Sequence, residues 1–520
     1  MSGNGNLDAG LQYHSGSKHS YQSVRFNPHA LDWDNKPLLF KIYPTLEVTR
    51  LPRDFHDTRR PALSAIADLG TTAQAESVPD LETLAELLFF SAGVIRSRKH
   101  AQGETFFRAA ACTGALYEIE LYVVCSDLPG RAVPGVKNPP GLAAGVYHFG
   151  AAEFGLRQLR AGDFRQALAD ATGGEPAVAQ APVTIVCSGT YWRNAWKYRS
   201  RTYRHFGWDN GTILANLLAM AGALSLPARV VAGFIDSQVD ALLGLDSKRE
   251  VAFSLVPIGR QRAALPSSPE VTALSLPMVP YSETEVEYPS MRRMHEASSL
   301  DSAAEVAAWR GKTPARQLSP TKGDTIVLKP LDESAIAKDS IEEVISRRGS
   351  ARRFALDPIT LPQLSTMLDR ATRGVPADFL DPEGSHLNDL YLIVNNVLGV
   401  TAGAYVYHWE KKALELLKAG DFREKAGYLG LEQQIPRDAS VDVFFLADLK
   451  KIMQRYGNRG YRAAQLEAGI LGGKLYLGAY AQRLGASGLT FYDDDVVSFF
   501  SPHARGKSAI FLVALGRGAK

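Results

Sequence analysis

The sequence has little cysteine and no long uninterrupted apolar run. The three cysteines among its 520 residues are Cys112, Cys125 and Cys187. None stands in a CxxC spacing or beside histidines in a zinc-binding pattern, so the sequence predicts neither a disulfide framework nor a metal site. This usage favours a reducing compartment. The longest apolar run, residues 213–234, is interrupted by a proline and an arginine and is not a membrane span.

The sequence also lacks a strong charge of either sign. The formal net charge is +3, with 45% hydrophobic and 22% charged residues. This balance is too mild to indicate nucleic-acid binding and is typical of a soluble globular protein. The start, MSGNGNLDAG, has no basic stretch or apolar core, so it does not read as a signal peptide and a cytoplasmic location is expected. No dinucleotide, P-loop, nucleophile-elbow or HExxH motif occurs in a suitable context.

The sequence does contain a repeat of itself. Residues 198–204 (YRSRTYR) return as residues 456–462 (YGNRGYR), at an offset of 258, and AGDFR at 161–165 returns at 419–423 with the same offset. Asp236 is matched to Asp494 at this offset. The period is too long for a solenoid and has the size of a domain. We therefore predict a dimer fused into one chain, with an internal interface that draws residues from both halves.

The order of the predicted elements indicates the fold class. The expected organisation is an N-terminal arm (1–60), a first domain (61–260), a proline- and serine-rich linker (261–335) and a second domain (336–520). Strands alternate with helices without βαβ regularity, which predicts an α+β fold: two tandem domains, mostly antiparallel, related by a pseudo-twofold axis. Predicted strands include residues 118–125, 182–187, 228–234 and 441–446. Predicted helices include residues 157–169 and 412–418, and residues 61–80 are expected to be a loop.

A cluster of arginines follows one predicted helix. Arg347, Arg348, Ser350 and Arg352 fall within six residues. Guanidinium groups donate paired hydrogen bonds to phosphate oxygens, so this segment is a candidate phosphate site. Lys507 could add positive charge. The alternatives are a solvated basic turn and an ordinary surface loop.

Two segments of small residues are candidates for close approach to a flat ring. The first precedes a predicted strand and contains Cys112, Thr113, Gly114 and Ala115. The second, GASGL at 485–489, joins a helix to a strand and contains Gly488 and Leu489. Small side chains let the backbone approach a ligand. A tight loop that merely feeds a strand explains the first segment equally well, and a helix–strand connection with glycine as the C-cap explains the second.

A lysine and a tyrosine precede the repeated motif. Lys197 could act as a base if burial or positive neighbours lowered its pKa, and Arg199, Arg201 and Arg204 would supply such neighbours. Tyr198 could relay a proton. Because Tyr198 is repeated as Tyr456, a structural role stays open. The duplicated His148 and His408 are expected to be structural.

Together these segments resemble the nitroreductase superfamily, and in particular its SagB/ThcOx branch. The run from Arg347 to Phe354 is similar to the phosphate-binding start of the family. Residues 110–123 resemble the branch's loop of small residues followed by Gly-Ala-Leu-Tyr, and residues 13–53 and 233–246 are also similar. The chain departs from the branch at Cys112 and Glu118, where proline is usual.

The resemblance implies an FMN-dependent oxidoreductase whose flavin lies between two copies of the fold. Carried over to this chain, the second half would hold the phosphate and one side of the ring, and the first half would cover the ring. The second-half residues are Arg347, Arg348, Ser350, Arg352, Gly488, Leu489 and Lys507. The first-half residues are Cys112, Thr113, Gly114 and Ala115.

The branch also implies a reaction, the oxidation of azolines to azoles in a ribosomal peptide with O₂ as acceptor. Lys197 and Tyr198 would be base and proton relay. The substrate would be a peptide or small molecule, with a modification-complex partner or a higher oligomer left open. Two alternatives remain: an NAD(P)H-dependent nitroreductase or flavin reductase, and a flavin-free scaffold.

The second pseudo-equivalent site is expected to lack flavin. The first half has no Arg-Arg-x-Ser run, and its nearest candidates are Arg50 and Arg53. The second-half loop at 382–389 is bulky and acidic, which would oppose a phosphate. One FMN per chain is therefore expected.

Overall fold

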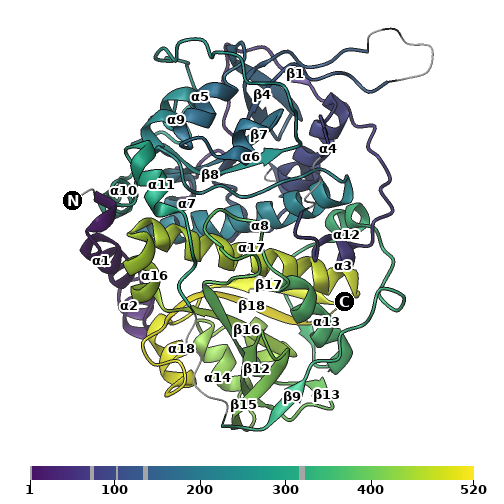
Figure 1. The fold of residues 1–520 in the computed structure, drawn as a ribbon. Helices are drawn as coiled ribbons and strands as arrows, with labels where there is room; N and C mark the ends of the chain where they lie inside the picture. Colours follow the sequence, from purple (N-terminus) through teal and green to yellow (C-terminus); the bar gives the residue numbers. More distant parts are fainter. Residues whose placement is uncertain are drawn as a thin grey trace.

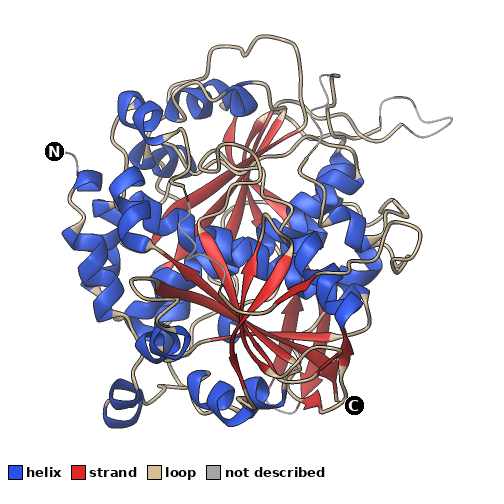
Figure 2. Ribbon diagram, turned by 60° about the horizontal axis from the view of Figure 1, so that its bottom comes forward, coloured by secondary structure: helices blue, strands red, loops and turns tan. Residues whose placement is uncertain are grey.

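The structure, a computed structural model, describes residues 3–70, 75–100, 103–132, 137, 139–315 and 322–519. Two halves, each with its own sheet, are stacked on either side of a pair of long helices (Figure 1). These helices are α8 (Thr202–Ala223) and α17 (Arg459–Ala481). In the turned view of Figure 2, the strands form two fans with helices to either side of them.

The first half is built on an antiparallel sheet with strand order β1-β6-β5-β4-β7-β8. Its strands are β1 (Thr49–Arg50), β4 (Ile119–Cys125), β5 (Gly145–Gly150), β6 (Gly155–Ala161), β7 (Val183–Thr190) and β8 (Glu250–Ile258). Its helices besides α8 are α3 (Ala62–Ala65), α4 (Leu81–Ala92), α5 (Arg165–Ala171), α6 (Pro176–Ala179), α7 (Tyr191–Tyr198) and α9 (Asp236–Leu243). Strand β4 is buried on both faces. Leu121 and Val123 belong to the core shared with α8, whereas Tyr122 and Val124 pack with residues of α5 and α9, as the two-residue period of a strand requires.

The second half is built on a larger sheet with order β10-β18-β16-β12-β14-β15-β9, in which β17 also pairs with β18. Its strands are β9 (Thr325–Val327), β10 (Phe354–Ala355), β12 (Asn388–Val394), β14 (Gly403–His408), β15 (Ala413–Ala419), β16 (Val441–Ala447), β17 (Gly485–Leu489) and β18 (Ser508–Gly518). Its helices besides α17 are α12 (Ile341–Arg347), α13 (Leu361–Ala371), α14 (Arg423–Leu429), α15 (Gln434–Asp438), α16 (Leu449–Tyr456) and α18 (Asp493–Phe500). The series β5-β6-α5-α6-β7-α7-α8-α9-β8 thus returns as β14-β15-α14-α15-β16-α16-α17-α18-β18. The predicted α+β fold of two tandem domains is confirmed.

The remaining elements lie in the arm, the connections and two small ribbons. They are η1 (Gly3–Gly5), α1 (Asp8–Gly16), α2 (Tyr21–Phe26), β2 (Val94–His100), β3 (Gly103–Arg108), η2 (Thr113–Ala115), η3 (Arg199–Arg201), α10 (Pro289–Ala297), α11 (Ala303–Trp309), β11 (Ile359–Thr360) and β13 (Val397–Leu398). Among the helices of these described ranges, none has the length and apolar character needed to cross a bilayer.

Some predicted elements are wrong. The helix predicted at 412–418 is strand β15, and the one predicted at 157–169 is strand β6 followed by the short helix α5. Both strands mix charged and apolar residues, a spacing that imitates a helix face. The strand predicted at 228–234 forms only isolated bridges, at residues 228, 230 and 231. The loop expected at 61–80 contains helix α3.

Glycines let the two long helices meet at backbone distance. A Cβ on Gly211 would lie 2.4 Å from a backbone carbon of Gly469, and one on Gly473 would lie 2.6 Å from the Cβ of Ala215. Side chains at the two glycines would force the helices apart. The repeated helices α8 and α17 therefore form the internal interface that the repeat predicted.

The repeated arginines form reciprocal ion pairs across this interface. Arg201 and Arg204 of the first half bind Asp493 of the second at 2.9 and 2.6 Å. Arg459 and Arg462 of the second half bind Asp236 of the first at 2.6 and 2.7 Å. All six side chains are buried. Burial alone would raise the pKa of Asp236, but its two arginines outweigh burial and lower the pKa to about 2.

The counterpart of Asp236 is therefore Asp493, one residue away from the expected Asp494. Asp494 lies on the surface and pairs with Lys18 of the N-terminal arm at 2.6 Å. The arm itself covers the interface: the ring of Tyr13 lies 5.7 Å from that of Tyr203 and 5.8 Å from that of Tyr461.

Candidate active site

Helix α8 holds a loop of small residues, 109–115, which we call the small loop. The backbone N of Thr113 donates to Oδ2 of Asp209 at 2.8 Å, and its hydroxyl donates to Oδ1 at 2.8 Å. Nearer the C-terminus of α8, the amide of Asn216 donates to the carbonyl of Ala109 at 3.1 Å. Both ends of the small loop are thus fixed to the same helix.

The arginine segment, residues 347–353, reaches the small loop from the other half of the chain. It follows α12, whose start is fixed by a capping box between Ser340 and Glu343. Arg348 donates from Nε to the carbonyl of Ala109 at 2.9 Å and from Nη2 to that of Arg108 at 3.0 Å. Its side chain is buried, and burial lowers its pKa. Arg348 therefore ties the two halves together where the sequence predicts a composite site.

A tyrosine that the sequence did not indicate joins the arginine segment to β17. The hydroxyl of Tyr476 lies 3.3 Å from Oγ of Ser350 and accepts a hydrogen bond from the backbone N of Gly488. A Cβ on Gly488 would lie 3.1 Å from the ring of Phe511. Ser350 and Gly488 are thus brought together, and Leu489 follows in the same strand. Tyr476 gave no local signal because its role depends on contacts more than ten residues away in each direction.

Lys197 and Tyr198 end helix α7 beside the small loop. Gly114 has φ +65, and a Cβ on it would lie 2.7 Å from the Tyr198 hydroxyl, so the hydroxyl lies directly against the loop. Burial raises the pKa of Tyr198, with negative charge on Asp209 adding to the effect, so the phenol stays neutral.

The pKa of Lys197 is lowered, as its expected role requires, but not by the arginines that the sequence indicated. Burial is the largest cause, followed by the positive charges of Arg352 and Lys36. Arg201 and Arg204 are occupied with Asp493. Arg352 thus acts on Lys197 from the other half of the chain.

Two of the predicted phosphate ligands have other partners. Arg347 binds Asp339 and donates to the carbonyl of Tyr480 at 2.9 Å. Lys507 pairs with Asp389 at 2.6 Å and precedes β18, whereas the arginine segment lies near the far end of β18, where Ala355 pairs with Arg517. At about 3.3 Å per residue the two ends are roughly 30 Å apart. The structure therefore does not bring Lys507 to this site.

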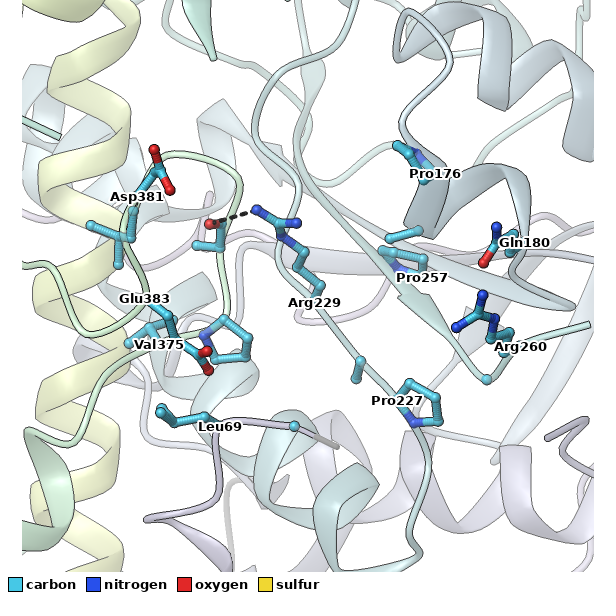
Figure 3. A pocket seen from close by; sticks show the side chains of 17 residues that line it. Leu69, Pro176, Gln180, Pro227, Arg229, Pro257, Arg260, Val375, Asp381 and Glu383 are labelled. Atoms are coloured by element: carbon cyan, nitrogen blue, oxygen red, sulfur yellow. Dashed lines mark hydrogen bonds between the residues drawn. The ribbon is translucent and has the colours of Figure 1, made fainter. Parts of the chain in front are cut away.

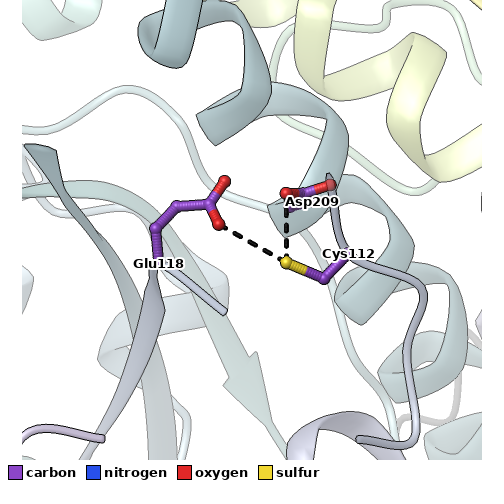
Figure 4. A group of neighbouring side chains, drawn as sticks. All are labelled: Cys112, Glu118 and Asp209. Atoms are coloured by element: carbon purple, nitrogen blue, oxygen red, sulfur yellow. Dashed lines mark hydrogen bonds between the residues drawn. The ribbon is translucent and has the colours of Figure 1, made fainter. Parts of the chain in front are cut away.

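Cys112 of the small loop, which is half-buried, forms a cluster with the buried side chains of Glu118 and Asp209 (Figure 4). The Cys112 thiol lies 3.3 Å from Oδ2 of Asp209 and 3.4 Å from Oε2 of Glu118. Burial, and then the charge of Asp209, raises the pKa of Glu118 well above its usual range. Burial likewise raises the pKa of the thiol. Because two of the three groups hold their protons, the cluster suits proton sharing better than cation binding.

Cys112 and Glu118 are the two positions where the sequence departs from the branch pattern. Their contact makes the two departures one structural feature. Sequence reasoning missed Asp209, although the matching offset of 258 leads to Glu467, another acid in the long helix of its half. Glu467 also holds a loop, accepting from the backbone N of Leu387 and of Asn388 at 2.9 Å each.

The pseudo-twofold relation places another segment where the arginine segment would be expected. Helices α3 and α12 begin with reciprocal bonds, from Ala62 N to the carbonyl of residue 339 and from Ile341 N to that of residue 60, each at 3.0 Å. Counting onward from the two helix starts, Asp68 corresponds to Arg347, Leu69 to Arg348 and Gly70 to Gly349. A Cβ on Gly374 would lie 3.0 Å from Cδ2 of Leu69, so an apolar contact replaces the bond from Arg348 to Ala109.

The arginines expected to be nearest to this position lie elsewhere. Arg50 donates to the carbonyl of Glu153 at 3.1 Å, and the guanidinium of Arg53 lies 4.5 Å from the ring centroid of Phe154. The duplicated histidines are structural, as expected: His148 contacts Glu120 at 2.9 Å and His408 contacts a glutamate at 2.6 Å.

Comparison with known proteins identifies the family. The Nitroreductase family model matches residues 73–260 and 345–517, one match in each half. The protein named "Putative nitroreductase MJ1384" from Methanocaldococcus jannaschii is 26% identical over 183 residues, which is 34% of this chain and 89% of that protein. A crystal structure of "a putative nitroreductase" from Anabaena variabilis is 24% identical, covers 98% of this chain and 99% of its own, and superposes with a TM-score of 0.72. That likeness extends the shared fold to the whole length. Since the family matches cover more than half of the chain, the protein belongs to the nitroreductase family of oxidoreductases.

Proposed function

We propose that the protein is an FMN-dependent oxidoreductase of the SagB/ThcOx type, with one active site between its halves. The observation that carries this proposal is the meeting of three segments: the small loop, the arginine segment and the end of α7. Each was expected at a flavin site from the resemblance, and each contacts or acts electrostatically on another.

The donor groups fit a phosphate. Arg352 is exposed, and no side-chain hydrogen bond or ion pair engages it among the described residues. The hydroxyl of Ser350 lies two residues away, and the exposed Arg96 is close enough to lower the pKa of Arg348. Free guanidinium donors beside a hydroxyl suit a dianionic phosphate. Arg347 and Arg348 would hold the segment in place, because their own donors are engaged elsewhere.

The surfaces beside these donors fit a flat ring. Gly114 and Gly488 have no side chains that could extend over a ring, and each already lets an aromatic side chain pack against its backbone: a Cβ would lie 2.7 Å from the Tyr198 hydroxyl at Gly114 and 3.1 Å from the Phe511 ring at Gly488. Cys112, Thr113 and Ala115 would complete the loop on one side, and Leu489 would lie on the other. The bond from Thr113 to Asp209 keeps the small loop at a fixed distance from α8.

When bound, FMN would accept a hydride from the substrate and pass the electrons on to O₂. Lys197 would take the proton from the carbon that is oxidised, because its lowered pKa increases the share of neutral amine near pH 7. The neutral Tyr198 would donate a hydrogen bond to the substrate. The resemblance supports an azoline in a peptide as the substrate, with an azole as the product.

The test uses the flavin-loaded protein and a synthetic azoline peptide. Lys197→Ala should lower the rate of azole formation by about 10²- to 10⁴-fold, the usual contribution of a general base, while FMN content stays the same. Lys450→Ala, at an exposed lysine of α16, is the matched control and should retain activity. Unchanged turnover in Lys197→Ala would contradict the assignment.

Two spectroscopic outcomes would contradict the proposal as a whole. Rapid anaerobic bleaching of the flavin by NADPH would favour a reductase. A purified protein that stays colourless after FMN is added would favour a scaffold.

A further inference from the structure

A cavity lies in the part of the fold that corresponds to the candidate active site under the pseudo-twofold relation, and Figure 3 shows its lining. Its volume is about 540 Å³, within the range of small-molecule sites. Its walls come from residues 69–70, 176–180, 227–229, 257–260 and 375–383. These segments follow α3, form α6, follow α8, end β8 and precede β12.

Four of these five walls have a counterpart in the candidate active site. The segments that follow α12 and α17 and precede β4 supply the arginine segment, β17 and the small loop. The ends of β8 and β18 correspond because β7 and β16 pair with them in the same register, Val183 with Ile258 and Val441 with Leu515. Arg260 is thereby the counterpart of Arg517. The cavity is the second of two sites that a symmetric dimer would have.

This second cavity has lost the chemistry of a phosphate site. Asp68 and Leu69 replace two arginines, and Oδ1 of Asp68 accepts from the backbone N of Gly70 at 3.1 Å. Asp381 and Glu383 add negative charge on one side of the cavity. Like charges disfavour a dianion there.

What remains is a pair of arginines opposite a pair of carboxylates. Arg229 donates one hydrogen bond to the carbonyl of Ala377, at 3.2 Å, and its guanidinium lies 3.7 Å from Glu175. The remaining N–H groups of its guanidinium can donate to a ligand. Arg260 has no side-chain hydrogen bond or ion pair within the described part of the chain. In Figure 3, Arg229 lies between Arg260 on one side and Asp381 and Glu383 on the other. Apolar walls are supplied by Pro176, Pro227, Pro257 and Pro376.

We propose that this cavity binds a short peptide with a free C-terminal carboxylate and a cationic side chain. Arg260, whose guanidinium has no side-chain partner in the described part of the chain, would receive the carboxylate, and the free donors of Arg229 would add positive charge beside it. Asp381 and Glu383 would attract the cation, and the prolines would cover a neighbouring apolar residue. This inference goes beyond the proposed function and stands without it, since no residue of the redox site takes part.

The test is calorimetric titration of the full-length, FMN-loaded protein with the dipeptide Leu-Lys. We expect saturable binding of one dipeptide per chain. Amidation of its carboxylate should weaken binding by about tenfold or more, because a charge-assisted pair is lost. Replacing the lysine of the dipeptide with norleucine should weaken binding to a smaller extent, because Asp381 and Glu383 are exposed.

The double variant Arg229→Gln, Arg260→Gln identifies the site. It should lose dipeptide binding while its FMN content and melting temperature stay close to those of the parent. Arg293→Gln, at an exposed arginine of α10 outside both sites, is the matched control and should bind as the parent does. Absence of binding up to about 10 mM, equal binding of the amide, or undiminished binding by the double variant would each overturn the proposal.

Discussion

The starts of α8 and α17 carry the same pattern of charge, whereas the segments that follow α3 and α12 do not. At the helices, two arginines from each half bind one aspartate of the other, with distances between 2.6 and 2.9 Å in both copies. After α12 the chain reads Arg-Arg-Gly, and after α3 it reads Asp-Leu-Gly. The two halves are alike where they bind each other and unlike where they would bind a ligand.

The difference has a physical reason. A change in either buried ion-pair set leaves charges without partners in the core, which is costly in both copies. A change in a ligand site affects only the ligand of that site. The internal interface therefore keeps the same ion pairs in both halves, whereas the segments beside it have diverged.

The equality of the two ion-pair sets can be tested first, since its effects should be the largest. Asp236→Asn and Asp493→Asn each leave two buried arginines unpaired, and we expect each to lower the free energy of unfolding by about 3–5 kcal/mol. Urea denaturation measures this. Asp494→Asn, which removes only a surface pair, should cost less than about 1 kcal/mol. If the losses in the free energy of unfolding for Asp236→Asn and Asp493→Asn differ by more than about 2 kcal/mol, the two ion-pair sets are not equivalent.

Making one site resemble the other should have the next largest effect. Arg348→Leu copies Leu69 and removes the bonds to the carbonyls of Arg108 and Ala109. We expect FMN affinity to fall about 100-fold, or about 2.7 kcal/mol, in a fluorescence titration. Arg293→Leu, at an exposed arginine of α10 outside the site, should bind FMN as the parent does. The reverse change, Leu69→Arg, should leave one FMN per chain, and a second bound FMN would contradict the asymmetry.

The acid cluster beneath the small loop should produce a smaller, pH-dependent effect. The pKa of Glu118 is raised in the folded state, so folding retains a proton that the unfolded chain loses above about pH 4.3. The free energy of unfolding should therefore fall as pH rises from about 4, by up to about 1.4 kcal/mol per unit, until Glu118 titrates. Glu118→Gln cannot ionise and should flatten this slope in denaturation curves between about pH 4 and 8. An unchanged slope would show that Glu118 is ionised in the fold.

Much of the fold could be predicted from the sequence, because the repeat consists of short motifs that can be recognised from neighbouring residues. The offset of 258 relates Tyr198 to Tyr456, and both residues end corresponding helices, α7 and α16. The predictions failed at the outer strands β6 and β15, whose charged residues repeat at a helix-like spacing. They also failed by one residue at Asp493, because Asp494 and Asp495 follow it and offer equal matches.

The site could be predicted only in part. The sequence indicated the arginine segment and the small loop because each concentrates its signal within a few residues, and the structure places the two in contact. Tyr476 and Asp209 were missed, since each acts from the middle of a long helix on a segment distant in sequence. Lys507 lies at the other end of β18 from the residues paired with Ala355, and the sequence could not indicate this because no motif records the length of β18.

The covalent joining of the two copies has a consequence for how such a protein can change. In a homodimer built from one gene, every substitution appears twice, so a mutation that improves one pocket alters its twin as well. Here residue 69 and residue 348 are separate codons. The chain can therefore keep arginine at position 348 while position 69 is leucine, and the cavity beside residue 69 can change its ligand independently.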